Sequence, residues 1–405
     1  MIVRISSSVS ASSSTSISEK LTATKALWFH RLLCLSQKGM VIIMAKTSRA
    51  VVLTDIRKME MQEFPIPEIK ANDGLLKVEI VGVCGSDPGF YTGKTKVPLP
   101  LLMGHEIVGR IEEIGEEKAR LNGVKKGDRV VVQNRFGCGV CKQCITGNYE
   151  KCIDKLGYGV FVPCSKPPYL WGAYSEYLYL PPRAMIHKID DSVPLEAAVL
   201  TTSVMGNCIR WLREIGGCNI GETVVIAGPG QQGLAATIVA KECGARVVVL
   251  GTGRDADRLA LAKEFGADYT VNVDETNAQE FLKELTNGEM AELFMDVTGS
   301  PRTLETAPDM VGTFGRIVIP GLYGGKPSNV DFDKVVFKQI QLLGVHAQSY
   351  RANEAAVKLV ESRKYAIEKM VTHKYALDEA EKAVLCTGRE IEGENPIKCV
   401  IMPNG

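Results

Sequence analysis

The stretch TVVIAGPGQQG, residues 223–233, decides the fold of this chain. Its first five residues are β-branched or apolar, as in a buried strand, and three glycines follow in a GxGxxG pattern. The pattern alone is weak, and a purely structural glycine-rich turn is the alternative. A strand before it and helical spacing over 234–243 after it supply the context that dinucleotide binding requires. The cofactor-binding residues predicted in this turn are Gly228, Pro229, Gly230, Gln231, Gln232 and Gly233.

Alternating strands and helices continue from this motif toward the C-terminus. Apolar runs typical of buried strands lie at 246–250, 269–273, 293–297, 317–320 and 340–345. Helical spacing separates some of them, as at 257–265. Such alternation predicts an α/β fold with a doubly wound parallel sheet and helices on both faces. After His346 we expect two helical stretches and a final strand, 398–402, that return to the first part of the chain.

The second predicted strand ends in residues that bear on the choice of nucleotide. A site that prefers NAD usually places a carboxylate there for the ribose hydroxyls, but this chain has Gly251, with Thr252 and Arg254 just beyond. Arginine at this point favours a 2′-phosphate; the alternative is that Asp255 or Asp257 reaches the ribose, which favours NAD. NAD and NADP both stay open. Residues predicted to line the nicotinamide end, where later strands finish, are Val297, Gly299 and Gly321.

Four cysteines before the nucleotide motif have the spacing of a metal site. Cys138, Cys141, Cys144 and Cys152 follow the pattern C-x2-C-x2-C-x7-C. Short C-x2-C turns place two sulfurs on one side of an ion, and four thiolates complete the tetrahedron that zinc prefers. Two disulfides or an iron–sulfur cluster are the alternatives. Because four thiolates leave no open position, we predict a structural zinc that takes no part in catalysis.

The region of about residues 49–200, which contains the four cysteines, consists mainly of short β-type runs. Two further segments of this region carry metal-binding side chains. Cys84 lies in VCGSD, residues 83–87, and His105 and Glu106 lie in GHE, residues 104–106. A thiolate and an imidazole can hold a zinc that keeps one position open for a substrate oxygen. A cysteine or histidine by itself is more often a core residue, but this combination beside a four-cysteine cluster is far more specific.

At this point the chain resembles the zinc-containing medium-chain dehydrogenases, which include alcohol, polyol and threonine dehydrogenases. The resemblance runs from about residue 50 to residue 403 and includes GHE followed by Gly109 and Gly115. It implies a GroES-like, mostly β catalytic domain and a Rossmann nucleotide-binding domain. It further implies two zinc ions, one catalytic and one structural, a small alcohol or carbonyl substrate, and a homo-oligomer, either dimer or tetramer. The domains then expected are an N-terminal extension (1–45), disordered, a catalytic domain with the zinc lobe (46–203), a Rossmann domain (204–346) and a C-terminal return (347–405).

The resemblance assigns roles residue by residue. Cys84 and His105 match the catalytic zinc ligands, Glu106 a neighbouring acid or exchangeable ligand, and Ser86 the hydroxyl that accepts the substrate proton. Relatives supply a third ligand just before the nucleotide domain, where residues 200–207 contain no such side chain. We therefore expect Glu106 to complete the site, with water or Cys208 as alternatives.

The proton relay differs from that of relatives as well. Relatives often carry a histidine five residues after the catalytic cysteine, and this chain has Gly89 there. The relay then ends at Ser86, uses Asp87 or water, or follows another path. The family's hydride-transfer chemistry is still expected.

Composition excludes several other classes of protein. The chain has 405 residues and a net charge of +1, which gives no basic surface for nucleic acid, and no apolar run reaches the roughly 20 residues of a membrane span. We expect a cytoplasmic protein. The Ser/Thr-rich start is interpreted as a tail, or as an extension upstream of a natural start at Met44. An organellar targeting segment is the weaker interpretation. A zinc-free quinone or enoyl reductase, a zinc-ribbon nucleic-acid binder and a catalytically lapsed relative are the rival interpretations.

Overall fold

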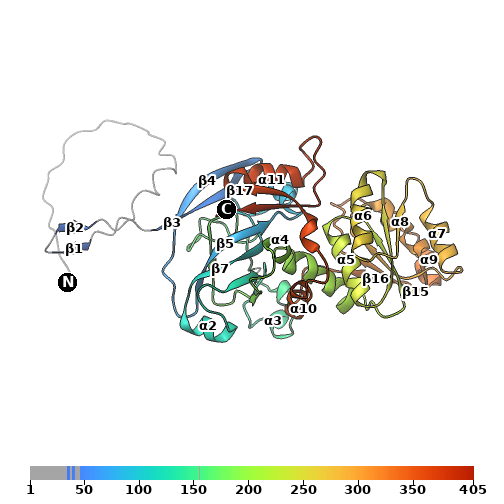
Figure 1. Ribbon diagram of the computed structural model, residues 1–405, viewed down its shortest axis with the longest axis horizontal. Coiled ribbons are helices and arrows are strands. Elements are labelled where there is room, and N and C mark those ends of the chain that lie inside the picture. The colour runs from blue at the N-terminus through green and yellow to red at the C-terminus, as the bar shows by residue number, and fades with distance from the viewer. Residues whose placement is uncertain (1–33, 37–38, 42–45, 155) are drawn as a thin grey trace, which may run out of the picture. The chain divides into compact units, whose positions relative to one another are not determined.

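The computed structural model describes residues 34–36, 39–41, 46–154 and 156–405 (Figure 1). The chain divides into two compact units, 1–46 and 47–405, and each is described by itself. The described residues of the first unit form an antiparallel pair of short strands, β1 (Cys34–Ser36) and β2 (Gly39–Val41). The predicted disordered extension falls mainly on residues outside the described ranges and stays a prediction.

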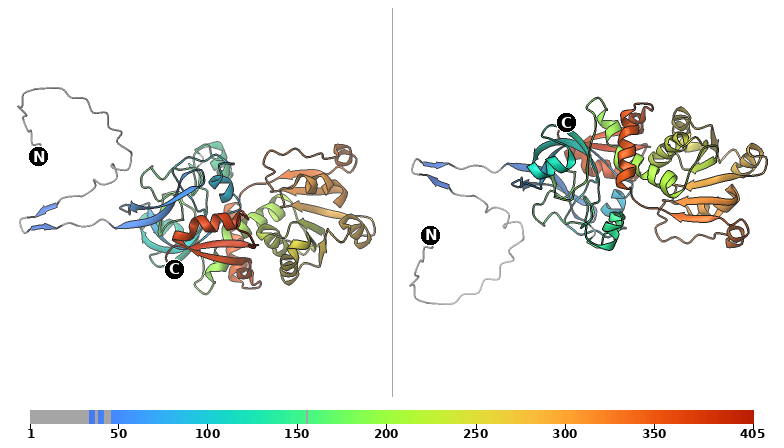
Figure 2. Two further views of the ribbon diagram at one scale, coloured as in Figure 1. Left: turned by 90° about the horizontal axis from the view of Figure 1, so that it is seen from above. Right: turned by 90° about the horizontal axis from the view of Figure 1, so that it is seen from below.

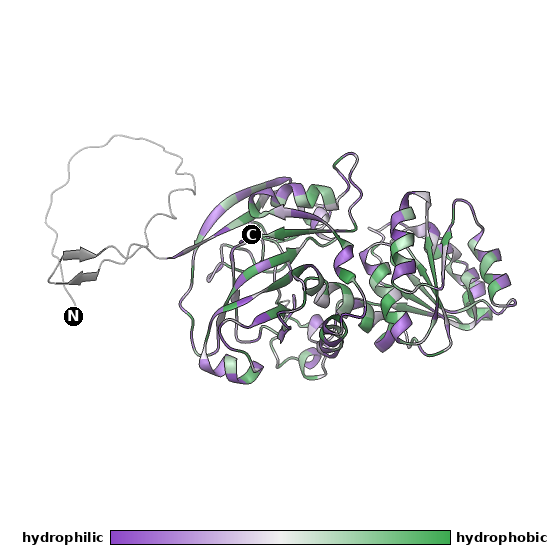
Figure 3. Ribbon diagram, viewed as in Figure 1, coloured by the Kyte–Doolittle hydropathy of each residue, from purple (hydrophilic) through white to green (hydrophobic). Residues whose placement is uncertain are grey.

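A six-stranded parallel sheet carries the glycine motif, as predicted. Its strand order is β13-β12-β11-β14-β15-β16, and each neighbouring pair is parallel. Figure 3 shows its strands in green because they are apolar runs, as expected for strands covered on both faces. The strands are β11 (Thr223–Ala227), β12 (Arg246–Gly251), β13 (Tyr269–Asn272), β14 (Ala291–Asp296), β15 (Val311–Ile319) and β16 (Gln341–Gly344).

Helices cover both faces of this sheet, as the packing of β11 demonstrates. Val224 and Ile226 belong to one hydrophobic cluster, together with Leu234 of helix α5. Val225 belongs to a different cluster, together with Leu282 of α7. Successive side chains of a strand point to opposite faces, so the two clusters lie on opposite sides. The helices are α5 (Gln231–Glu242), α6 (Ala256–Glu264), α7 (Ala278–Leu285), α8 (Pro301–Met310) and α9 (Phe332–Phe337).

A seven-stranded, mostly antiparallel sheet forms the other part of 47–405. Its order is β10-β8-β7-β5-β18-β17, with β9 also paired to β5, and a three-stranded sheet β4-β3-β6 accompanies it. The strands of the larger sheet are β5 (Gly74–Gly82), β7 (Glu106–Ile114), β8 (Arg129–Val132), β9 (Tyr177–Leu180), β10 (Ile186–Lys188), β17 (Val371–Ala376) and β18 (Lys398–Met402). Those of the smaller sheet are β3 (Thr47–Asp55), β4 (Lys58–Pro65) and β6 (Leu101–Leu102).

Short helical elements connect these strands. The α-helices are α1 (Asp87–Tyr91), α2 (Glu116–Asn122), α3 (Lys142–Ile145) and α4 (Leu195–Ala198). The 3-10 helices are η2 (Tyr149–Lys151), η5 (Gly253–Asp255), η6 (Ile367–Met370) and η7 (Leu377–Glu379), and the π-helical segments are η3 (Thr201–Gly206) and η4 (Ile209–Ile215). None of the helices in the described part of the chain has the length and apolar character needed to cross a bilayer.

The C-terminal residues return to the seven-stranded sheet. Strand β18 pairs with β5, with Val400 opposite Gly82, and both views of Figure 2 show the red C-terminal elements beside the blue strands. Helices α10 (Tyr350–Glu361) and α11 (Ala380–Thr387) match the two expected helical stretches. Strand β17 was not predicted. It has no strong apolar pattern and exists because β18 offers it a partner in the sheet.

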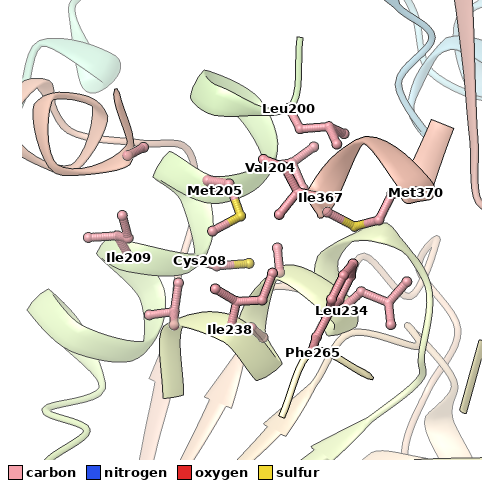
Figure 4. Packing of buried hydrophobic residues seen from close by; sticks show 14 of the residues in the cluster. Leu200, Val204, Met205, Cys208, Ile209, Leu234, Ile238, Phe265, Ile367 and Met370 are labelled. Carbon is pink, nitrogen blue, oxygen red and sulfur yellow. The ribbon is translucent and has the colours of Figure 1, made fainter. Parts of the chain in front are cut away.

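One hydrophobic cluster includes residues from both large sheets. Val108 of the mixed sheet and Ile226 of the parallel sheet belong to it, and segments η3 and η4 run through it. Figure 4 shows Met205 and Cys208 among the apolar side chains of this cluster, which include Ile238 and Leu234. The metal-binding and nucleotide-binding parts of the chain therefore share a common core.

Candidate active site

The structure brings Cys84, His105 and Glu106 together. Cys84 follows strand β5 and His105 precedes β7, and these neighbouring strands are antiparallel, with Gly82 opposite Glu106. One donor atom of each of the three side chains lies within 4.8 Å of the other two. Gly104 makes the approach possible. Its φ is +94°, and a Cβ there would lie 2.7 Å from the Tyr174 nitrogen.

A buried carboxylate orients the histidine. Asp87 Oδ1 lies 3.6 Å from His105 Nδ1, while Asp87 Oδ2 accepts hydrogen bonds from the Cys84 amide at 2.9 Å and the Tyr174 hydroxyl at 2.8 Å. Burial lowers the pKa of His105, but the Asp87 carboxylate and the Cys84 thiolate outweigh it and raise that pKa to about 9. Asp87 is 0% exposed and contacts both His105 and Tyr174. A proton relay through Asp87 stays a prediction.

A buried lysine from the last strand faces the third donor. Lys398 Nζ forms an ion pair with Glu106 Oε2 and donates to the Val83 carbonyl at 3.1 Å, and both charged side chains are 0% exposed. Gly82 is required here, because a Cβ would overlap the Glu106 carboxylate. Sequence reasoning missed Lys398. The available signal was a lysine opening the otherwise apolar strand KCVIM.

Three polar side-chain atoms of this site have no hydrogen-bond partner. They are Glu106 Oε1, His105 Nδ1 and Asp87 Oδ1, all buried. Buried polar atoms are seldom left unsatisfied, and thiolate, imidazole and carboxylate together form a donor set that suits zinc. The residues therefore fit a cation held between Cys84, His105 and Glu106.

Cys208 does not join this site, which corrects one alternative for the third ligand. Its thiol contacts the Gln232 carbonyl at 3.2 Å, and the residue is 0% exposed within the hydrophobic cluster of Figure 4. The neighbouring segment η3 contains no cysteine, histidine or acid. Glu106 is thus the candidate third ligand that lies beside the pair.

Ser86 lies at the start of α1, between Cys84 and Asp87. It is half-buried and is the N-cap residue, but its side chain makes no capping hydrogen bond. The hydroxyl is therefore available to a ligand. Gly89 lies in the same short helix, and a Cβ there would lie 3.2 Å from the Thr95 hydroxyl oxygen.

The four-cysteine lobe is gathered as its spacing predicts. Cys138 Sγ lies 4.0 Å from Cys144 Sγ, and Cys141 Sγ lies 3.9 Å from Cys152 Sγ. Sulfurs about 2.3 Å from one ion at tetrahedral corners are about 3.8 Å apart, so the sulfurs fit zinc, whereas these two separations are too long for disulfides. Backbone N–H groups of Ile153 and Cys144 lower the pKa of the Cys141 thiol to about 6, which favours the thiolate a metal needs.

The glycine motif leads into helix α5, whose N-terminus has no side-chain cap. Helix α5 begins at Gln231 after Gly230, and no side chain caps its first turn. Gly228 has a φ of +100°, and a Cβ on Gly233 would overlap the Gly228 carbonyl oxygen. Free N–H groups at such a start are donors for a pyrophosphate. Gln232 instead points toward η3, where its side-chain nitrogen donates to the Ser203 carbonyl at 3.0 Å.

The loops after β14 and β15 meet this turn, and their role at the nicotinamide end stays a prediction. A Cβ on Gly228 would lie 2.9 Å from a methyl carbon of Thr298, and one on Gly321 would lie 2.9 Å from the Gly299 nitrogen. The Val297 amide donates to the Ala227 carbonyl at 3.1 Å. The sequence reasoning missed Asp296. Asp296 accepts from the Thr298 hydroxyl and from the Tyr323 hydroxyl, each at 2.6 Å, and thereby ties two loops together.

Comparisons with known proteins agree with this architecture. Residues 70–191 match the family model described as alcohol dehydrogenase GroES-like domain, and residues 233–362 match zinc-binding dehydrogenase. A probable alcohol dehydrogenase of Mycobacterium tuberculosis is 36% identical over 365 residues, covering 88% of this chain and 98% of the relative. A sorbitol dehydrogenase of Halalkalibacterium halodurans is 30% identical, with 85% and 95% covered. The crystal structure of a Thermotoga maritima alcohol dehydrogenase superposes with a TM-score of 0.81 at 29% identity, covering 89% of this chain and all of that one.

The chain belongs to the zinc-containing medium-chain dehydrogenase family. The dehydrogenase is a zinc-dependent oxidoreductase that uses NAD or NADP. The four-cysteine lobe is therefore part of a dehydrogenase catalytic domain, which removes the basis for a zinc-ribbon nucleic-acid binder. The family match also favours the zinc-dependent activity over that of a zinc-free reductase.

Proposed function

We propose that Cys84, His105 and Glu106 hold the catalytic zinc of an enzyme that interconverts a small alcohol and its carbonyl. The observation that carries the proposal is the grouping of these three donors within 4.8 Å, with one Glu106 oxygen left without a partner. We assign the structural zinc to Cys138, Cys141, Cys144 and Cys152, whose four thiolates leave no position for a substrate.

The side chains around the first site have separate tasks in this proposal. When bound, zinc supplies Lewis acidity toward the substrate oxygen and the nicotinamide supplies the hydride acceptor. The Asp87 carboxylate lies 3.6 Å from His105 Nδ1, and its charge favours a proton on that nitrogen, which leaves Nε2 for the metal. The Ser86 hydroxyl would receive the alcohol proton and release its own to water, since it is half-buried, lies beside Cys84 and has no capping role.

The nucleotide binds where the two sets of loops meet. The first turn of α5 holds the pyrophosphate through its free N–H groups. Loops containing Val297, Gly299 and Gly321 line the nicotinamide end, held by Asp296.

Two coarser features complete the proposal. We propose a cytoplasmic enzyme, because the cysteines of the described residues are unpaired thiols and such thiols persist in a reducing compartment. We also propose a homo-oligomer, dimer or tetramer. Light scattering of the purified chain tests the second point, and a monomer at micromolar concentration contradicts it.

A substrate panel with both nucleotides tests the function. The wild-type protein should oxidise at least one alcohol, and Cys84→Ser should lose turnover while it still binds nucleotide. Cys243→Ser is the matched control, since Cys243 is half-buried like Cys84 but lies at the far end of α5. Full activity of Cys84→Ser contradicts the proposal. Absence of turnover in the wild-type protein, while zinc and nucleotide are bound, contradicts it as well.

A further inference from the structure

We infer that this chain selects the dinucleotide that carries a 2′-phosphate, NADP, and that Arg254 is the residue that binds this phosphate. The inference rests on the proposed function and specifies its cofactor. Its evidence is the set of side chains at the carboxyl end of strand β12, beside the glycine motif.

The position that usually reads the ribose hydroxyls holds no side chain. Strand β12 ends at Gly251, next to the phosphate-binding turn, and a Cβ there would lie 3.0 Å from Pro229 Cγ and 3.2 Å from Asp255 Cβ. A carboxylate on this residue would therefore have to displace its neighbours. The interaction by which NAD sites recognise two free hydroxyls is missing at this point.

The next carboxylate along the chain is already occupied. Asp255 Oδ2 accepts from the Thr252 amide at 3.0 Å and from the Thr252 hydroxyl at 2.7 Å, while Oδ1 pairs with Arg258 at 3.1 Å. The Asp255 residue is only 9% exposed. Both oxygens shape the turn, so neither is available for a ribose.

Arg254 is left as the accessible cation of this turn. It is exposed, and within the described residues its guanidinium has no ion-pair partner. The backbone around it is fixed, since Asn395 donates to the Arg254 carbonyl at 3.4 Å and accepts from Arg258 at 2.7 Å. A free guanidinium on an anchored turn is suited to a phosphate, which it can bind through two parallel hydrogen bonds.

Two exposed carboxylates are the competing candidates. Asp274 Oδ2 accepts from the Gly253 amide at 2.8 Å, and Asp257 lies in the first turn of α6. If Asp274 reads the ribose hydroxyls, the chain prefers NAD. Asp274 already ties the loop after β13 to the loop after β12, whereas Arg254 has no such structural task.

Binding of two small nucleotides to the full-length zinc protein tests the inference without turnover. The probes are 2′,5′-ADP and 5′-AMP, which differ only in the 2′-phosphate, measured by titration calorimetry. The wild-type protein should bind 2′,5′-ADP about tenfold to a hundredfold more tightly, the size of one charge-assisted contact. Arg254→Gln should remove most of that ratio and leave 5′-AMP binding unchanged. Arg351→Gln, an exposed arginine on α10, should keep the ratio.

The remaining outcomes separate the two proposals. Equal affinity for the probes, or an Arg254→Gln protein with an unchanged ratio, overturns the inference and leaves the dehydrogenase function standing. Loss of 5′-AMP binding in Asp274→Asn assigns the ribose to that carboxylate and also overturns it. Binding of neither probe contradicts the nucleotide site itself and hence both proposals.

Discussion

The two metal-binding clusters of this protein are built in opposite ways. The lobe takes its four thiolates from one loop, 138–152, and backbone N–H groups support them. The Cys84 cluster takes its donors from two strands, and its partner Lys398 lies 292 residues from Glu106. The lobe cysteines are half-exposed apart from Cys152, whereas His105 and Glu106 are buried among charged groups. The first cluster is therefore a local structure, and the second depends on the whole sheet being assembled.

The largest expected effect comes from breaking the local cluster. Cys144→Ser should reduce bound zinc from two ions to one per chain, expose residues 138–152 to proteases and lower the unfolding midpoint. Structural zinc contributes about 10–16 kcal/mol to the folding of zinc-finger peptides, so loss of the ion should loosen the lobe. Metal analysis with limited proteolysis measures both changes.

Cys84→Ser is the comparison for that experiment. It should also lose one zinc, but its protease pattern should match that of the wild type because strands β5 and β7 already fix the surrounding backbone. Equal proteolysis of the two variants would show that the clusters do not differ as described.

The next largest effect is expected from breaking the buried ion pair between Lys398 and Glu106 in the Cys84 cluster. Lys398→Met leaves Glu106 buried without its cation, and breaking such a pair costs about 3–5 kcal/mol of unfolding free energy. Urea unfolding of the zinc protein measures this loss. Glu106→Gln combined with Lys398→Met should recover part of it, since the buried carboxylate charge is gone, while the zinc loses its third ligand.

Lys374→Met supplies the matched control on the neighbouring strand β17. Its lysine pairs with Glu196 but is 51% exposed, and exposed pairs contribute about 0–1 kcal/mol. If Lys374→Met and Lys398→Met are equally destabilised, the Glu106 pair has no special importance.

A smaller effect is expected when the orientation of His105 is disturbed. Asp87→Asn keeps the size of the side chain but removes the charge that faces Nδ1, and loss of such a partner typically costs about 10–100-fold in activity or metal affinity. Both kcat/KM and zinc affinity should fall while lobe zinc stays bound. An unchanged zinc affinity would show that Asp87 contributes to folding and not to the metal site.

The smallest effect concerns the hydroxyl that supports Asp87. Tyr174→Phe removes one buried hydrogen bond of 2.8 Å and should cost about 1 kcal/mol of stability and a few-fold in kcat/KM. Tyr158→Phe is the control, because its hydroxyl is equally buried and donates to the Tyr179 carbonyl at 3.0 Å away from Asp87. It should lose stability but no activity, and equal activity losses in both variants contradict a role for Tyr174 in the site.

Much of the fold could be predicted because its signals are local. Strands β11 and β18 coincide with the predicted apolar runs, and α5 begins at the glycine motif as expected. Strand β17 could not be predicted, since its pairing with β18 and not its own pattern makes it a strand. The N-terminal boundary and the other domain limits stay predictions.

The sequence by itself determined the chemistry that short spacing encodes: four thiolates in one loop, a glycine turn between strand and helix, and a cysteine followed by a Gly-His-Glu segment. Only the tertiary structure decided which distant groups complete these sites. It placed Lys398 against Glu106, Asp87 and Tyr174 behind His105, and Cys208 in the core away from the metal ligands. The physical reason is that a turn fixes neighbours within a few residues, whereas burial of charge requires partners from strands that meet only when the sheet closes.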